Sequence, residues 1–255
     1  MDAEAVRASL HTYIASHESE FHELPTIQSQ LLELATLVLV AEHYRIAGYA
    51  IGAENLKDGK FRVKRTSAGY QWRFSWFRAT RGPMEVEIHT NLKVAGAYGR
   101  DDGVYVVDVA VCNPNVVPRT DQAKKTWVAL ANKHLVTWVE AKKLVVYPML
   151  LAQFIGIVHE LSPDCLNGPN RNEFQEGGHF PPALVTTGNF TRGCAQIRAG
   201  FAERGFRVAV VRNLDVALAC LNEPYAESPF VEPDQTSQAP TSPSPSQIVC
   251  ALSDT

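Results

Sequence analysis

The sequence has no cysteines at the spacings typical of disulfide scaffolds or metal sites. Its five cysteines are far apart and odd in number, and no Cys-x-x-Cys occurs among them. Small disulfide-rich folds and structural zinc sites usually bring cysteines together in recurring patterns. The cysteine content therefore favours neither, and it indicates a reducing compartment.

Long hydrophobic runs and an excess of positive charge are also missing. The longest apolar run, residues 34–41, is too short to cross a bilayer. The first twenty residues are acidic and lack the basic start and apolar centre of a secretion signal. The formal net charge of −3 excludes a uniformly basic nucleic-acid coat, although a local basic patch stays open. We therefore expect a soluble cytoplasmic protein.

Several catalytic motifs are absent. The chain contains no Gly-x-Ser-x-Gly and no Gly-rich dinucleotide fingerprint. The glycines and lysine of residues 52–60 do not have phosphate-loop spacing, and the His-Glu-Leu of residues 159–161 lacks the second histidine of a zinc protease. These absences argue against serine hydrolases, P-loop enzymes, zinc proteases and nicotinamide-dependent enzymes.

What is present is the composition of an ordinary globular protein, with 45% hydrophobic and 20% charged residues among 255. From residue 223 onward, proline, serine and threonine dominate. Such a stretch buries too little apolar area to offset its ordering entropy. We expect one α/β domain over residues 1–222 and a disordered tail over residues 223–255.

Periodicity predicts alternating helices and strands within that domain. An N-terminal part, residues 1–83, should hold two helices (3–17 and 25–47) and a hairpin (60–65 with 70–77). The core, residues 84–222, should hold the strands 83–94, 104–112, 134–144, 182–190 and 206–211 and the helices 147–161 and 191–205. Gly205 is the expected C-cap of the last helix. This order predicts a mixed central β-sheet flanked by helices.

Asp108 is the one charged residue in the valine-rich strand of residues 104–111. A lone buried carboxylate is costly, so it must be paired, protonated or bound to a metal. Asp108 is therefore a candidate site residue.

A second strand carries two opposite charges on one face. Because alternate residues of a strand share a face, Val136, Trp138, Glu140 and Lys142 should point the same way. If this strand neighbours that of Asp108, the two carboxylates and the ammonium meet. Two carboxylates at that separation suit Mg²⁺, or Mn²⁺ as a substitute, and a nearby lysine can act on a water. Together they have the parts needed for metal-assisted phosphodiester hydrolysis.

Asp108 near the end of a valine-rich strand, followed by Val139–Lys142 ("VEAK") on a later strand, resembles the PD-(D/E)xK nuclease superfamily, whose fold is restriction-endonuclease-like. The resemblance implies that Asp108 and Glu140 bind a metal, that the Ala141 carbonyl adds a third ligand and that Lys142 acts on the water. Gln153 lies where many members keep a polar residue near the site. DNA is the implied substrate, a homodimer would suit duplex cutting, and restriction or phage defence is the implied context.

The family usually has a further acidic residue upstream. Glu87 is the first choice, since it precedes Asp108 by one strand and turn, and Glu42 on the second helix is the rival. Val107 stands where the proline that names the motif would be.

Two other interpretations stay open. The charged triplet can be a structural ion pair at a sheet edge, and the domain a catalytically inactive nucleic-acid-binding or protein-interaction module. Basic residues near the site can hold a phosphate backbone or form ordinary solvated surface; they are Lys57, Lys60, Arg62, Lys64, Arg65, Lys124, Lys125, Lys133 and Lys143.

Overall fold

A computed structural model describes residues 20–21, 28–99, 103–167, 178–212, 214 and 230. The expected helix over residues 3–17 lies outside the described residues, as does the expected tail except for Phe230. In chain order the elements are β1 (Glu20–Phe21), α2 (Gln28–Ile46), β2 (Ala50–Glu54), β3 (Lys60–Phe61), η1 (Gln71–Arg73), β4 (Trp76–Arg81), β5 (Met84–Ala95), β6 (Val104–Cys112), η2 (Asp121–Lys125), η3 (Asn132–His134), β7 (Leu135–Lys142), α3 (Pro148–Leu161), η4 (Pro163–Leu166), β8 (Ala183–Thr186), α5 (Cys194–Glu203) and β9 (Ala209–Val211).

A seven-stranded mixed sheet forms the centre of the molecule, in the order β2-β4-β5-β6-β7-β8-β9. Neighbouring strands are antiparallel from β2 to β7 and parallel from β7 to β9. Parallel neighbours need a crossover connection, and α3 and α5 lie within the two that are required. The predicted α/β architecture with a mixed sheet flanked by helices is confirmed.

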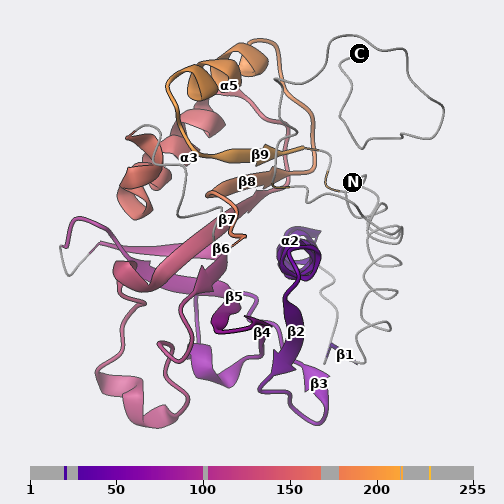
Figure 1. Ribbon diagram of the computed structural model, residues 1–255, viewed down its shortest axis with the longest axis vertical. Coiled ribbons are helices and arrows are strands. Elements are labelled where there is room, and N and C mark those ends of the chain that lie inside the picture. Colours follow the sequence, from indigo (N-terminus) through magenta and orange to yellow (C-terminus); the bar gives the residue numbers. More distant parts are fainter. Residues whose placement is uncertain are drawn as a thin grey trace.

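Two hydrophobic layers cover the faces of this sheet. One joins α2 to residues such as Ile88 and Val109, and the other joins α3 and α5 to residues such as Leu92 and Trp138. Figure 1 shows α2 on one side of the sheet and α3 and α5 on the other. No helix in the described part of the chain is long and apolar enough to cross a membrane.

Helix α2 is described from Gln28 to Ile46, and residues 25–27 of the expected helix lie outside the described residues. The helix is far more buried than an amphipathic helix. From Leu31 to Tyr44 all side chains but one are buried, and the exception is Glu33. Leucine, alanine and valine fill this stretch on every side of the helix, which agrees with packing against more than one layer. A charged group in such a helix needs a specific partner.

The predicted hairpin of residues 60–65 and 70–77 is wrong. Only Lys60–Phe61 of the first segment is a strand, and it pairs with β1 in parallel. The second segment begins as the 3₁₀ turn η1, and its strand β4 pairs with β2 and β5. Strand β2 was not predicted. Local alternation was present, but pairing partners far along the chain decided which residues became strands.

The strands and helices expected over the core are confirmed, including Pro148 in the first turn of α3. Gly205 adopts φ +72° just after α5, as a C-cap requires.

One detail of β7 differs from simple alternation. The pairing of β6 with β7 shifts near Cys112, and Val136 packs with the α2 layer while Trp138 packs with the α3 layer. The shift breaks the two-residue period, so Val136 does not share the face of Trp138.

Candidate active site

Strands β6 and β7 are antiparallel neighbours, which is the condition for bringing the candidate residues together. Their paired residues run as far as Val109 and Val139. Asp108 lies one residue beyond that pair, and its Oδ2 accepts a hydrogen bond from the Ala141 backbone N–H at 2.7 Å. The side chain of Asp108 therefore takes up a backbone donor of β7 at the point where the paired residues end.

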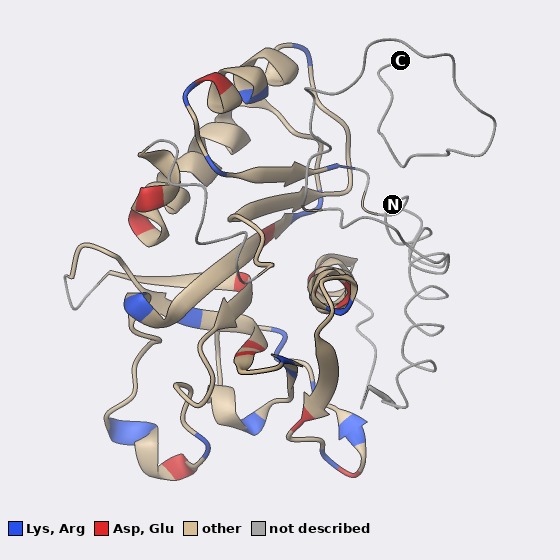
Figure 2. Ribbon diagram, in the orientation of Figure 1, with Lys and Arg blue, Asp and Glu red and all other residues tan. Residues whose placement is uncertain are grey.

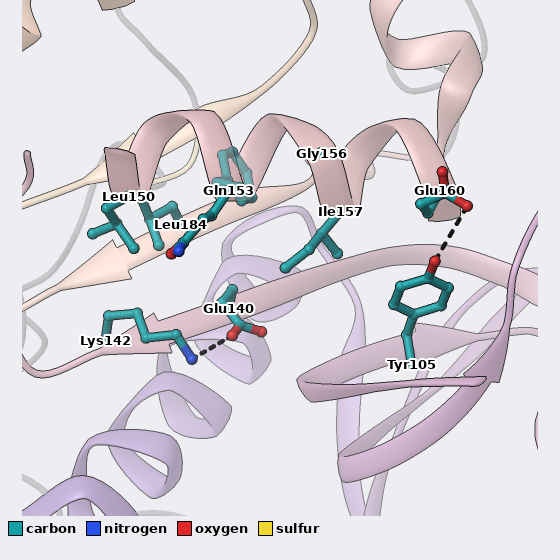
Figure 3. A pocket seen from close by; sticks show the side chains of 10 residues that line it. Tyr105, Glu140, Lys142, Leu150, Gln153, Gly156, Ile157, Glu160 and Leu184 are labelled. Carbon is teal, nitrogen blue, oxygen red and sulfur yellow. Dashed lines mark hydrogen bonds and ion pairs between the residues drawn. The ribbon is translucent and has the colours of Figure 1, made fainter. Parts of the chain in front are cut away.

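Lys142 lies between the two carboxylates. Its ammonium forms an ion pair with Glu140 and lies 4.0 Å from Asp108 Oδ2. The Lys142 side chain is 39% exposed, whereas Asp108 and Glu140 are 16% and 12% exposed. The structure thus brings the three predicted side chains to one partly open position (Figure 3 shows the Glu140–Lys142 pair).

Asp108 reaches Lys142 and the β7 backbone because the alternation of side chains changes on β5 and β6. On β5, Ile88 packs with the α2 layer and Leu92 with the α3 layer, although residues four apart in a regular strand share a face. Between them, Asn91 has φ +48°, in the left-handed region. Its neighbours pair with Val109 and Val107, so Asn91 stands opposite Asp108.

Strand β6 shows the same change at Asp108. Val109 packs with the α2 layer and Val107 with the α3 layer, two residues away. Asp108 therefore sits where the strand changes the faces of its side chains. This explains why its carboxylate reaches the β7 backbone rather than entering one of the packed layers.

Glu33 of α2 is a further carboxylate of this site. Burial raises the pKa of Glu33 to about 7, with the charges of Asp108 and Glu140 adding to the increase and Lys142 opposing it. Its Oε2 accepts a hydrogen bond from Asn91 Nδ2 at 2.8 Å. Glu33 was not predicted from the sequence, although, like Asp108, it is an isolated charge within an apolar stretch.

A buried polar network holds Asn91 in position. The Lys64 ammonium, in a residue that is 2% exposed, donates to the Asn91 carbonyl at 2.8 Å and to Gln71 Oε1 at 3.0 Å. Asn91 Nδ2 also donates to the Lys64 carbonyl at 3.1 Å. Burial lowers the pKa of Lys64 to about 8. Through Asn91, Glu33 is therefore connected to a buried hydrogen-bond network that includes Lys64 and Gln71.

The electrostatics of the site indicate an excess of negative charge. Burial raises the pKa of Asp108, and burial together with Asp108 raises the pKa of Glu140 to about 7. Burial alone would lower the pKa of Lys142, but Glu140 and Asp108 raise it. Two carboxylates thus share one ammonium, the charge of Glu33 acts on the same group, and a divalent cation would relieve the repulsion among the carboxylates.

Neither predicted upstream carboxylate joins the site. Glu87 pairs with Cys112, four residues along β6 from Asp108, which is about 13 Å at about 3.3 Å per residue. Glu42 lies nine residues after Glu33 on α2 and forms an ion pair with Arg45. Nine residues are two and a half helical turns, so Glu42 is about 14 Å away and on the opposite side of α2. Among the three, Glu33 is the carboxylate whose charge couples to Asp108, Glu140 and Lys142.

Gln153 does lie beside the site. A cavity of about 360 Å³ is lined at one end by Glu140, Lys142 and Gln153, and apolar residues of α3 form much of the rest. Figure 3 shows Gln153 extending from α3 toward the Glu140–Lys142 pair. At the other end of the cavity, Tyr105 donates to Glu160 at 3.2 Å.

The basic residues form no single stripe around this site in the part of the chain that the structure describes. Figure 2 shows them on several separate elements, including η2 and β3. Lys64 is buried, and Lys143 donates to Gln28. A phosphate-binding role for the remaining lysines and arginines stays a prediction.

The donor types of the site suit a hard divalent cation, although the carboxylate oxygens of Glu33, Asp108 and Glu140 do not all lie within 4.8 Å of one another, so these side chains would have to approach to share one ion. Glu33, Asp108 and Glu140 supply carboxylate oxygens, which Mg²⁺ and Mn²⁺ prefer. The Ala141 carbonyl as a third ligand stays a prediction. Comparisons with protein-family models, with curated proteins and with solved structures find no match to this chain. The geometry of the site is thus the basis for any functional assignment.

Proposed function

We propose that this protein is a Mg²⁺-dependent nuclease of the PD-(D/E)xK type, with a restriction-endonuclease-like fold, that hydrolyses phosphodiester bonds in DNA. The observation that carries the proposal is the convergence of Asp108, Glu140 and Lys142 from adjacent strands. Glu33 adds a carboxylate from α2. Mn²⁺ is expected to substitute for Mg²⁺.

Glu33, Asp108 and Glu140 would hold the ion. Bound there, Mg²⁺ would supply Lewis-acid chemistry: it would acidify a water and neutralise charge on the phosphate. Asn91 fixes the orientation of Glu33, and the Ala141 N–H fixes that of Asp108. Two of the three carboxylates are thus oriented by hydrogen bonds, and the three would have to move closer together to bind one ion.

Lys142 has a role that its charge defines. Its pKa is raised by Glu140, so it carries a proton at neutral pH and is a poor general base. A protonated ammonium, 39% exposed, can donate a hydrogen bond to the attacking water and offset charge that develops on the phosphate. Lys142 would thus orient the water rather than remove its proton.

The test is a cleavage assay on supercoiled and linear DNA with purified full-length protein and Mg²⁺. We expect nicking or degradation that a chelator stops. Lys142→Ala should reduce the rate by about 100-fold or more. The neighbouring Lys143→Ala is the matched control, because it removes the same charge one residue away, where the side chain contacts Gln28 of α2.

Circular dichroism should show that both lysine variants are folded. A Lys142→Ala variant as active as the wild type would refute the assignment, and so would cleavage that persists in Asp108→Ala.

A second candidate function has one observation in its favour. The Lys142 ammonium already pairs with Glu140 and lies near Asp108, as in a structural ion pair. The domain would then be a catalytically inactive module that binds nucleic acid. It would bind DNA with an affinity that falls steeply with salt, and it would cleave neither strand with Mg²⁺ or Mn²⁺.

A further inference from the structure

A second cluster of potential metal ligands lies between β5 and β6, away from the candidate active site. Among the residues that the structure describes, Glu87, His89 and Cys112 are the one group of three whose ligating atoms all lie within 4.8 Å of one another. All three are buried, with exposures of 0%, 1% and 0%. The cluster is therefore enclosed, unlike the site around Asp108.

The sheet itself brings these residues together. Glu87 and Cys112 are direct partners across β5 and β6, and His89 follows Glu87 by two residues on the same face. Trp76 of β4 stacks on His89, with ring centroids 5.6 Å apart. The positions are thus fixed by strand pairing and packing, which is how rigid metal sites are built.

The two oxygens of Glu87 have different surroundings. Oε1 accepts hydrogen bonds from the Asn115 backbone N–H at 2.9 Å and from the Arg119 guanidinium. Oε2 faces the cluster and lies 3.1 Å from His89 Nε2. One oxygen is therefore already occupied by donors, while the other points at the imidazole.

The two ring nitrogens of His89 have different surroundings. Nε2 lies 3.1 Å from Glu87 Oε2, so it is the nitrogen on the Glu87 side and the one that would bind a shared ion. Nδ1 is buried and has no hydrogen-bond partner among the described residues. Cys112 is buried as well and forms no disulfide, so its sulfur is available as a ligand.

We propose that Glu87, His89 and Cys112 form a zinc site. Sulfur, imidazole nitrogen and carboxylate oxygen together make the ligand set of Zn²⁺, and a thiolate is a poor ligand for Mg²⁺. Ligands of a tetrahedral Zn²⁺ lie roughly 3.3–3.8 Å apart, so the cluster needs only a small contraction. Because the cluster supplies three ligands, a water would have to complete a tetrahedral site. Arg119 stays on Glu87 Oε1 and orients the carboxylate.

The zinc would have a structural role. Its ligands would link β5 to β6 next to the segment that contains Asn115 and Arg119. Asp108 lies four residues before Cys112 on β6, so the ion would stabilise the same strand pair that carries the candidate active site. This inference does not depend on the proposed nuclease activity. The spacing of the cysteines did not predict it, because a single cysteine contributes.

The test uses tag-free full-length protein loaded with Co²⁺, which reports a thiolate ligand through a charge-transfer band and a tetrahedral site through its visible bands. We expect both signals, and one Zn²⁺ per chain by mass spectrometry after extensive dialysis. Cys112→Ser and His89→Gln should each weaken Zn²⁺ binding by more than about 100-fold. Cys165→Ser removes another buried thiol and should leave both signals unchanged.

A folded wild-type protein without a thiolate band in Co²⁺ would overturn the proposal, and this result does not depend on any variant folding. A band that persists in Cys112→Ser would overturn it too. Asp108→Ala, which alters the other site, should keep the Co²⁺ spectrum.

Discussion

Asp108 and Cys112 lie four residues apart on β6, yet the carboxylate groups around them differ in almost every respect. Around Asp108, two carboxylates share the ammonium of Lys142, which is 39% exposed, and the charge of Glu33 acts on them. Around Cys112, the fully buried Glu87 has Arg119 and a backbone N–H on one oxygen. The carboxylates around Asp108 have excess negative charge and lie beside solvent. The carboxylate of Glu87 is enclosed, and Arg119 neutralises its charge.

Strand pairing accounts for this difference, because it determines which partners a carboxylate in a strand can reach. Glu87 lies where β5 is paired on both sides, with Arg78 of β4 and Cys112 of β6, so it must find its partners within the protein. Asp108 lies one residue beyond the last β6–β7 pair, where a side chain can replace a backbone acceptor and still meet solvent. A substrate-binding site must be open to solvent, whereas a structural site must be closed to it.

The first prediction contrasts substitutions of Asp108 and Glu87, which should affect activity and stability respectively. Asp108→Asn should reduce DNA cleavage by about 100-fold or more, because a carboxylate that binds the ion is lost, while stability changes little. Glu87→Gln should instead lower the free energy of unfolding by about 2–3 kcal/mol, since the Arg119 charge loses its partner. Cleavage rates and urea denaturation of both variants check this. A large loss of stability in Asp108→Asn would contradict the distinction.

A buried histidine outside both groups shows the effect of burial on the pKa of an imidazole. Burial lowers the pKa of His43 to about 4, and its Nε2 is hydrogen-bonded to the Gly178 carbonyl at 2.8 Å. Because the folded pKa lies below the unfolded value of about 6.5, this stability is complete above pH 6.5 and is lost as pH falls toward 4. The loss should reach about 3 kcal/mol.

The measurement is the difference in unfolding free energy between wild type and His43→Leu at pH 7.5 and pH 4.5. Subtracting the variant removes the titration of other groups. Equal differences at the two pH values would show that His43 is not buried in its neutral form.

The next prediction tests whether Glu33 belongs to the partly open site around Asp108. Glu33→Gln should weaken Mg²⁺ binding and reduce cleavage by about 10–100-fold. Glu42→Gln is its matched control, because Glu42 is on the same helix but pairs with Arg45. Titration of cleavage against Mg²⁺ concentration measures both effects. Similar losses in the two variants would remove Glu33 from the site.

The smallest expected effect concerns the backbone of Asn91, whose φ is +48°. Asn91→Gly and Asn91→Ala both lose the hydrogen bond to Glu33, but only glycine adopts this φ without strain. Asn91→Ala should therefore be less stable than Asn91→Gly by about 1 kcal/mol in urea denaturation. Equal stability of the two would mean that β5 does not need a left-handed residue there.

Much of the sheet could be predicted because its signals are local. The valine run of β6, the alternation of β5 and the proline and glycine at the ends of α3 and α5 each lie within a few residues. The meeting of Asp108 with Glu140 and Lys142 followed from one assumption, that β6 and β7 are neighbours. The pairing of these strands confirms it.

The rest depends on contacts between distant parts of the chain. Glu33 is 75 residues before Asp108, and the packing of α2 on the sheet brings it near. The hairpin failed because β4 pairs with β2 and β5 rather than with the preceding segment. The change of face at Asn91 and Asp108 cannot be seen from a two-residue period, since it is a departure from that period.

The central claim is that Glu33, Asp108 and Glu140 hold a divalent cation beside Lys142. The most direct measurement is a crystal structure of the full chain soaked with Mn²⁺, with the anomalous signal used to locate the ion. The account predicts a peak about 2.0–2.3 Å from carboxylate oxygens of Asp108 and Glu140, with the Lys142 ammonium displaced from Glu140. Manganese that binds elsewhere, while the Lys142–Glu140 ion pair remains intact, would contradict it.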